Sequence, residues 1–186
     1  HKLVALAHVP NLPGPLLDAK RAAAPAHAVG EKLLLDGCQA VPRLPVDVAD
    51  LDCDFYVFSG HKLYGPTGIG VLWGRYDLLD AMPPYQGGGS MIDRVTFART
   101  TYAPPPGRFE AGTPHITGVI GLHAAIDYVD GIGLDRIHAH ETALVTTTRA
   151  ALAGLNSVRV FGPADSAGIV SFEVEGVHPH DVPTIL

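Results

Sequence analysis

The sequence predicts an α/β fold in which a large domain with a mainly parallel sheet is followed by part of a small α+β domain. Short apolar runs that end in polar residues have the continuous hydrophobic character of strands buried in a parallel sheet. They cover residues 2–9, 33–35 and 54–58. From about Gly133 onward the predicted order is helix, strand, strand and helix, which is typical of a small α+β unit. We therefore expect one domain part over residues 1–132 and another over residues 133–186.

The first strand, expected over residues 2–9, leads into a proline-rich turn over residues 10–15. Because proline blocks both helix and sheet ladder, this turn should leave Asn11 at the sheet edge where the strand ends. Residues 16–29 have helix-forming composition, and Pro25 inside them predicts a kink or two short helices.

The second strand ends on Asp36, and the third, 54–58, leads directly to Ser59 and Lys62. In open α/β sheets, the carboxyl ends of parallel strands form the edge where ligands bind. A carboxylate, a hydroxyl and an amine at one such edge suit pyridoxal phosphate. Its aldehyde bonds to a lysine, its ring nitrogen needs a carboxylate to stay protonated, and its phosphate needs hydroxyls and backbone amides.

Composition and periodicity predict the remaining elements. A strand is expected over residues 70–74, a short helix over 76–82, and loops over 87–90 and 100–107. Apolar residues recur at helical spacing from Ile116 to Val129. A second helix is expected over residues 134–155, strands over 158–161 and 169–174, and the start of a helix over 179–186.

Composition also narrows the class of protein. The net charge of -6 has both signs scattered along the 186 residues, which argues against a nucleic-acid surface. No apolar run approaches the roughly 20 residues of a membrane helix, so no membrane partner is expected. Cys38 and Cys53 are too few for a disulfide framework, which makes a reducing cytoplasm the default location. Because the chain starts at His1 in an interior strand pattern, we interpret it as a fragment.

Three motifs closely resemble the Suf-type cysteine desulfurases, which have the fold of class V aminotransferases. The motifs are Asp36-Gly37-Cys38-Gln39, the stretch from Leu51 to Gly70, and the stretch from Arg108 to Pro114, with weaker similarity from about Leu3 to the last residue. The resemblance implies fold type I of the pyridoxal-phosphate enzymes, with a large α/β domain that holds the cofactor. It also implies conversion of L-cysteine to L-alanine, with persulfide sulfur passed to an acceptor protein for iron-sulfur cluster assembly.

The same resemblance implies roles for individual residues near the second and third strands. Lys62 would bond to the cofactor and transfer protons, and Asp36 would pair with its ring nitrogen. Gln39 would contact the phenolic oxygen of the cofactor, and Asn11 would contact the cofactor as well. Read without the resemblance, Lys62 is an ordinary surface lysine, Asp36 a strand end or cap, and Asn11 a turn residue.

Further residues would bind the phosphate group of the cofactor. Ser59 and His61 resemble the phosphate ligands of the family, since short donors and an imidazole offset a dianion. Thr113 resembles the threonine that reaches the phosphate of the other subunit's cofactor, which implies a homodimer. The alternative for Thr113 is a helix N-cap ahead of Pro114.

Some positions depart from the family pattern. Pro10 stands where a small residue such as serine is usual, Cys38 where alanine is usual, and His115 where asparagine is common. Cys38 and Cys53 are predicted to be packed side chains rather than nucleophiles. The paired histidines are spaced two apart and cannot share a helix face, so no metal site is predicted.

Other functions stay open at this point. A selenocysteine lyase or another class V enzyme would use the same lysine, and a non-catalytic fragment would act only in dimerisation or binding. The persulfide-forming cysteine and the arginine for the substrate carboxylate are expected outside this chain. The chain by itself is therefore predicted to be inactive as a desulfurase.

Overall fold

The structure is a computed structural model that describes residues 2–11, 16–164, 166 and 168–185. Part of the proline-rich turn predicted at residues 10–15 thus lies outside the described residues. The strands are β1 (Leu3–Ala7), β2 (Lys32–Asp36), β3 (Phe55–Ser59), β4 (Gly70–Gly74), β5 (Ile92–Val95), β6 (Thr100–Tyr102), β7 (Val158–Phe161) and β8 (Ser171–Val174). The helices are α1 (Ala19–Ala28), α2 (Tyr76–Ala81), α3 (Ile116–Ile132), α4 (Leu134–Ala153) and α5 (Val182–Ile185), with short 3-10 helices η1 (Gly60–Leu63) and η2 (Gly107–Phe109).

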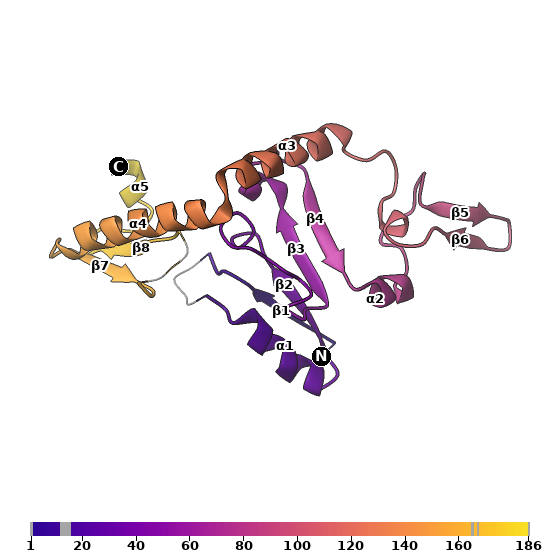
Figure 1. Cartoon of the computed structure of the whole chain (residues 1–186), viewed down its shortest axis with the longest axis horizontal. Coiled ribbons are helices and arrows are strands. Elements are labelled where there is room, and N and C mark those ends of the chain that lie inside the picture. Colours follow the sequence, from indigo (N-terminus) through magenta and orange to yellow (C-terminus); the bar gives the residue numbers. More distant parts are fainter. Residues whose placement is uncertain (1, 12–15, 165, 167, 186) are drawn as a thin grey trace.

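A four-stranded sheet in the order β1-β2-β3-β4 forms the centre of the molecule (Figure 1). The strands β1, β2 and β3 are parallel, whereas β4 pairs antiparallel with β3. The prediction of a mainly parallel sheet is therefore confirmed. Because Ala7 pairs with Asp36 and Asp36 with Val57, the three parallel strands end at a common edge.

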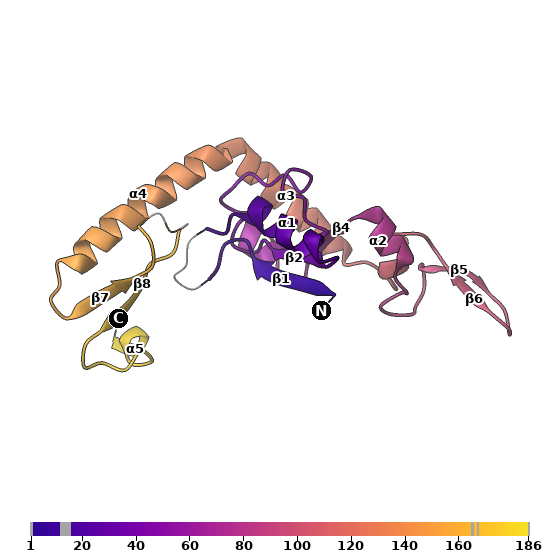
Figure 2. The ribbon, with the colours of Figure 1, turned by 90° about the horizontal axis from the view of Figure 1, so that it is seen from below.

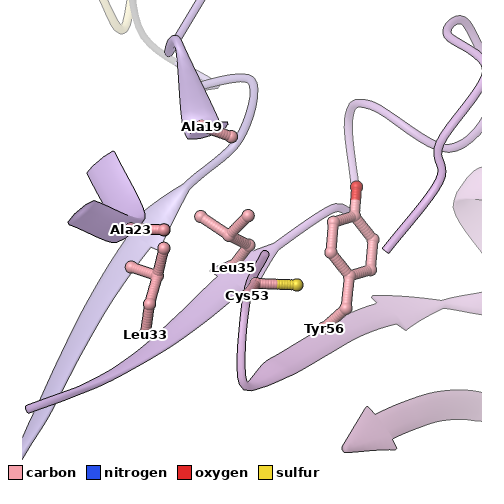
Figure 3. Packing of buried hydrophobic residues seen from close by; sticks show 6 residues of the cluster. All are labelled: Ala19, Ala23, Leu33, Leu35, Cys53 and Tyr56. Atoms are coloured by element: carbon pink, nitrogen blue, oxygen red, sulfur yellow. The ribbon is translucent and has the colours of Figure 1, made fainter. Parts of the chain in front are cut away.

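Alternate residues of β2 build the core between the sheet and α1. Leu33 and Leu35 are fully buried and belong to one cluster with Ala19 and Ala23 of α1 and with Tyr56 of β3 (Figure 3). The alanines have only a methyl group, so α1 can lie close to the strand. Burial of each leucine stabilises the fold by about 1.5–3 kcal/mol.

Helix α3 holds the segment that follows β3. Its Leu122 and Val129 pack with Leu63 of η1 in a second buried cluster. Gly133, at φ 91°, ends α3 and is also the N-cap residue of α4, so a single residue joins the two helices. Figure 2 shows α4 running on from α3, with the β7–β8 hairpin and α5 beside it.

Two predicted elements differ from the structure. Residues 100–107, expected as a loop, contain β6, which forms a hairpin with β5 away from the central sheet (Figure 1). Helix α1 starts at Ala19 instead of residue 16 and runs through Pro25 as one helix, so two separate pieces do not form. Its start is fixed by Asp18, whose side chain accepts a hydrogen bond from the Arg21 amide at 3.0 Å.

The other predicted elements are confirmed, with ends that shift by a few residues. Cys53 is fully buried, as predicted. In the described part of the chain, every helix is too short or too polar to pass through a bilayer.

Candidate active site

The candidate site is the edge at which the three parallel strands end. Two backbone hydrogen bonds extend the ladder past the strands, from His8 N to Asp36 O at 2.9 Å and from Gly37 N to Val57 O at 2.8 Å. The segments that leave β1, β2 and β3 therefore run side by side. They carry Asn11, Asp36, Gln39, Ser59, His61 and Lys62.

Asp36 closes the turn that follows β2. Its Oδ1 accepts a hydrogen bond from the Cys38 amide at 2.9 Å, which is the strand-end role left open by the sequence. Burial raises the pKa of the Cys38 thiol, as does its hydrogen bond with Asp36, while the Ser59 backbone and the Lys62 charge act in the opposite direction. The Asp36 carboxylate therefore lies directly beside Cys38 at the end of β2.

The turn after β3 carries the hydroxyl, the imidazole and the amine. Ser59 Oγ and His61 Nδ1 lie 2.8 Å apart, so these two side chains form one polar pair. The turn is tight because Gly60 has no side chain. A Cβ there would lie 2.9 Å from Ile69 Cγ2 and 3.4 Å from Leu122 of α3. The glycine thus lets α3 press η1 against the sheet edge.

The side-chain amides of Gln39 and Asn11 connect the segments that follow β2 and β1. Gln39 Nε2 donates to Asn11 Oδ1 at 2.8 Å, so Asn11 is more than an isolated turn residue. Arg43 Nη1 in turn donates to the main-chain oxygen of Gln39 at 2.9 Å and to its side-chain Oε1 at 2.7 Å. Sequence reasoning missed Arg43, because it belongs to none of the three motifs.

Burial keeps two supporting groups of the site neutral. It raises the pKa of the Tyr56 hydroxyl well above its usual range and lowers the pKa of His8. Both residues are buried, and the Tyr56 hydroxyl reaches His8, the residue that follows β1. A neutral phenol and a neutral imidazole give this edge a support without charge.

Thr113 makes no hydrogen bond to this group within the described residues. It is exposed on the segment between η2 and α3. Helix α3 has His115 as its N-cap, so the alternative role of Thr113 as N-cap is wrong. The contact of Thr113 with a second subunit's cofactor stays a prediction.

Metal ligands are not grouped anywhere in the described ranges. Among residues 2–11, 16–164, 166 and 168–185, no three side chains of His, Cys, Asp or Glu are placed to hold a metal ion together.

Comparisons with known proteins cover the full chain. Residues 1–186 match the family model for Aminotransferase class-V. The cysteine desulfurase of Dickeya dadantii (strain 3937) is 50% identical over 186 residues, which are 100% of this chain and 45% of the relative. The chain therefore spans about half the length of the curated relatives it matches.

Solved structures agree with that comparison. The cysteine desulfurase CsdA from Escherichia coli has a TM-score of 0.93 and 42% identity, covering 98% of this chain and 46% of that one. A mutant of C-DES with glycine covalently linked to the PLP cofactor has a TM-score of 0.84 and 28% identity. It covers 97% of this chain and 49% of that one.

Proposed function

The chain belongs to the class V aminotransferase family, and we propose on that premise that it is part of a pyridoxal-phosphate-dependent cysteine desulfurase. The observation that carries the proposal is that Asp36 and Ser59 end neighbouring parallel strands at one sheet edge, with Lys62 in η1 directly after β3. Similarity to cysteine desulfurases over the whole chain supports L-cysteine as substrate and L-alanine as product. In this proposal, residues 1–132 are part of the cofactor-binding domain and residues 133–186 part of the small domain.

The residues at the edge fit the chemistry of this cofactor. The Lys62 amine suits the aldehyde, and the Asp36 carboxylate suits a protonated ring nitrogen. The pair of Ser59 and His61 offers donors to a phosphate dianion, beside the positive charge of Lys62. When bound, pyridoxal phosphate supplies an electron sink for the α-carbon of an amino acid.

Each residue then has a task that its contacts permit. Lys62 Nζ transfers a proton at the substrate α-carbon as general acid and base. Asp36 Oδ1 accepts the hydrogen bond of the Cys38 amide, which leaves Oδ2 for the ring nitrogen. Gln39 and Asn11 contact the cofactor edge from the neighbouring exits.

The proposal extends to partners and location. The protein acts as a homodimer in which Thr113 reaches the cofactor of the partner subunit, and the exposure of Thr113 supports this. The sulfur passes to an acceptor protein for iron-sulfur cluster assembly, as in the Suf-type enzymes that the motifs resemble. The free thiols of Cys38 and Cys53 support a reducing cytoplasm.

Borohydride reduction of the protein loaded with pyridoxal phosphate tests the proposal. The sequence has only Lys2, Lys20, Lys32 and Lys62 as lysines, so peptide mass mapping distinguishes every possible attachment site. We expect the label on Lys62, its loss in Lys62→Ala, and its retention in the matched control Lys20→Ala. Lys20 is an exposed residue of α1 paired with Asp50.

Two results would contradict the proposal. A label on another lysine would remove Lys62 from its role, and a protein that takes up no pyridoxal phosphate would be a binding or dimerisation fragment. Release of alanine from L-cysteine, compared with release from L-selenocysteine, separates a desulfurase from a selenocysteine lyase.

A further inference from the structure

Arg43 lies where three segments that are distant in sequence meet. Its Nη1 contacts Gln39, as described above, while its Nε lies 3.0 Å from Oε2 of Glu141 on α4. Both side chains are largely buried, at 17% and 20% exposure. Gly168, between β7 and β8, covers the pair so closely that a Cβ there would lie 2.6 Å from Arg43 Nε. The guanidinium therefore joins the sheet edge to the C-terminal segment.

Hydrogen-bond chemistry fixes the direction of the Gln39 amide. A guanidinium is only a donor, so the atom of Gln39 that faces Arg43 must be the oxygen Oε1. The amino group of Gln39 then points the other way and donates one hydrogen to Asn11 Oδ1. Because that oxygen is used, Asn11 also has its amino group left to offer. Arg43 thereby turns both amides so that donors are available at the sheet edge.

Glu141 holds Arg43 in this orientation. Arg43 Nε and Glu141 Oε2 are buried atoms without a well-aligned hydrogen bond among the described residues, so their contact is an ion pair sustained by charge. Without Glu141, the guanidinium would be left buried without its charge partner, which favours a turn toward solvent. Such a turn would release the Gln39 oxygen.

We propose that Arg43 is a positioning residue of the active site, held by Glu141, that presents the amino groups of Gln39 and Asn11 as donors to the phenolic oxygen of the cofactor. This inference rests on the proposed function, because it requires Gln39 to face pyridoxal phosphate. It also makes the C-terminal segment, through α4, a part of the cofactor site.

The test is a pH titration of the visible absorbance of pyridoxal phosphate bound to the full protein. A donor at the phenolic oxygen stabilises the deprotonated form of the lysine-bound cofactor, so removal of the donor raises the titration midpoint. We expect Arg43→Met to raise it by about one pH unit, the size of one hydrogen bond to a charged group. Retention of the cofactor on dilution should fall several-fold.

Matched variants separate positioning from general damage. Arg159→Met removes another Arg–Glu pair, an exposed one on the β7–β8 hairpin, where Arg159 Nη1 lies 3.5 Å from Glu173 Oε1. We expect it to leave the midpoint unchanged. Glu141→Gln should move the midpoint in the same direction as Arg43→Met but by less. If Arg43→Met does not fold, Glu141→Gln decides, and an unchanged midpoint in it overturns the inference.

A Gln39→Ala background gives the sharpest result. If Arg43 acts through Gln39, Arg43→Met should produce no further shift in that background. Equal shifts in both backgrounds, or no shift in either, would overturn the inference while pyridoxal phosphate still attaches to Lys62. Absence of attachment to Lys62 in the unmodified protein would instead overturn the proposed function, and the inference with it.

Discussion

The hydroxyl of Tyr56 on β3 lies 3.0 Å from Nδ1 of His8, which follows β1, so the contact spans the exit of β2 between them. The two rings meet edge to face, with an interplanar angle of 88°. Passage across β2 is possible because Gly37 has no side chain. A Cβ at Gly37 would lie 2.1 Å from Tyr56 Cε1. The glycine that follows Asp36 therefore has a packing role below the candidate site.

Gly37→Ala should destabilise the protein strongly. The tyrosine ring must move, which breaks a buried hydrogen bond and overpacks the core, at a combined cost of about 2–4 kcal/mol. Chemical denaturation monitored by circular dichroism measures the loss. Gly87→Ala is the control, because no atom lies within 4 Å of a Cβ placed there. Equal stability of the two variants would contradict the contact.

In the full-length protein, Asp36→Asn should reduce turnover more than cofactor binding. The amide keeps the shape of the side chain but cannot hold a proton at the ring nitrogen by charge, so we expect alanine formation to fall by about 10²–10⁴-fold, as for lost acid–base groups. Alanine release and cofactor content are measured on the same sample. Asp93→Asn on the exposed strand β5 serves as control. Full turnover in Asp36→Asn would remove this role.

Asp54 should make the fold sensitive to acid. Its side chain is 3% exposed and accepts hydrogen bonds from the Leu33 amide and from His27 Nε2, both at 2.8 Å. Burial alone would raise its pKa, but the Leu33 amide, His27 and Lys32 outweigh burial and hold the pKa below the ordinary 3.8. A lowered folded pKa means that this stabilisation is present above pH 3.8 and is lost as the pH falls below it.

Asp54→Asn should therefore cost about 1.5–3 kcal/mol at neutral pH, because the buried Leu33 amide and His27 lose a charged acceptor. It should also flatten the loss of stability as the pH falls through 3.8 and below, where the lowered folded pKa places that loss. Thermal unfolding across this range measures both effects, with exposed Asp50→Asn as control. If the stability of the variant and of the parent decreased equally with falling pH, Asp54 would not be the cause of the sensitivity to acid.

The two thiols should react slowly at neutral pH. Burial raises the pKa of both Cys38 and Cys53, and the thiolate is the reactive form. We expect slow labelling by a disulfide reagent at pH 7 that accelerates above pH 9. Cys38→Ser and Cys53→Ser assign each phase. Rapid labelling at pH 7 would show that one of them is a usable nucleophile, against the prediction that both are packed residues.

The central sheet could be predicted because its strands are short runs of continuously apolar residues. In β2, Leu33 and Leu35 are fully buried and Leu34 is half-buried, so the run is apolar throughout and leaves a clear pattern. The β5–β6 hairpin could not be predicted in this way. Ile92 to Val95 are all exposed and pair only with β6, so no apolar alternation marks them. The start of α1 had a signal in Asp18, an N-cap residue that the composition of the segment obscured.

The candidate site likewise has a part that the sequence predicts and a part that it does not. The position of Asp36, Ser59 and Lys62 at one sheet edge could be predicted, because the strand ends of a parallel sheet converge whatever the loops do. The contact between Gln39 and Asn11 was outside the reach of sequence patterns, since it depends on side-chain rotamers. Arg43 depends on Glu141, 98 positions later in the chain, and only the packing of α4 brings the two together.

The single-residue joint at Gly133 gives α4 the geometry of a lever. A helix of 20 residues extends about 30 Å from that pivot, whereas Glu141 lies only about 12 Å along it. A change of about 10° in the angle between α3 and α4 would move the far end of α4 by about 5 Å but Glu141 by only about 2 Å. The ion pair with Arg43 thus holds α4 at a point close to Gly133. A small displacement at the sheet edge therefore corresponds to a large displacement at the far end of α4.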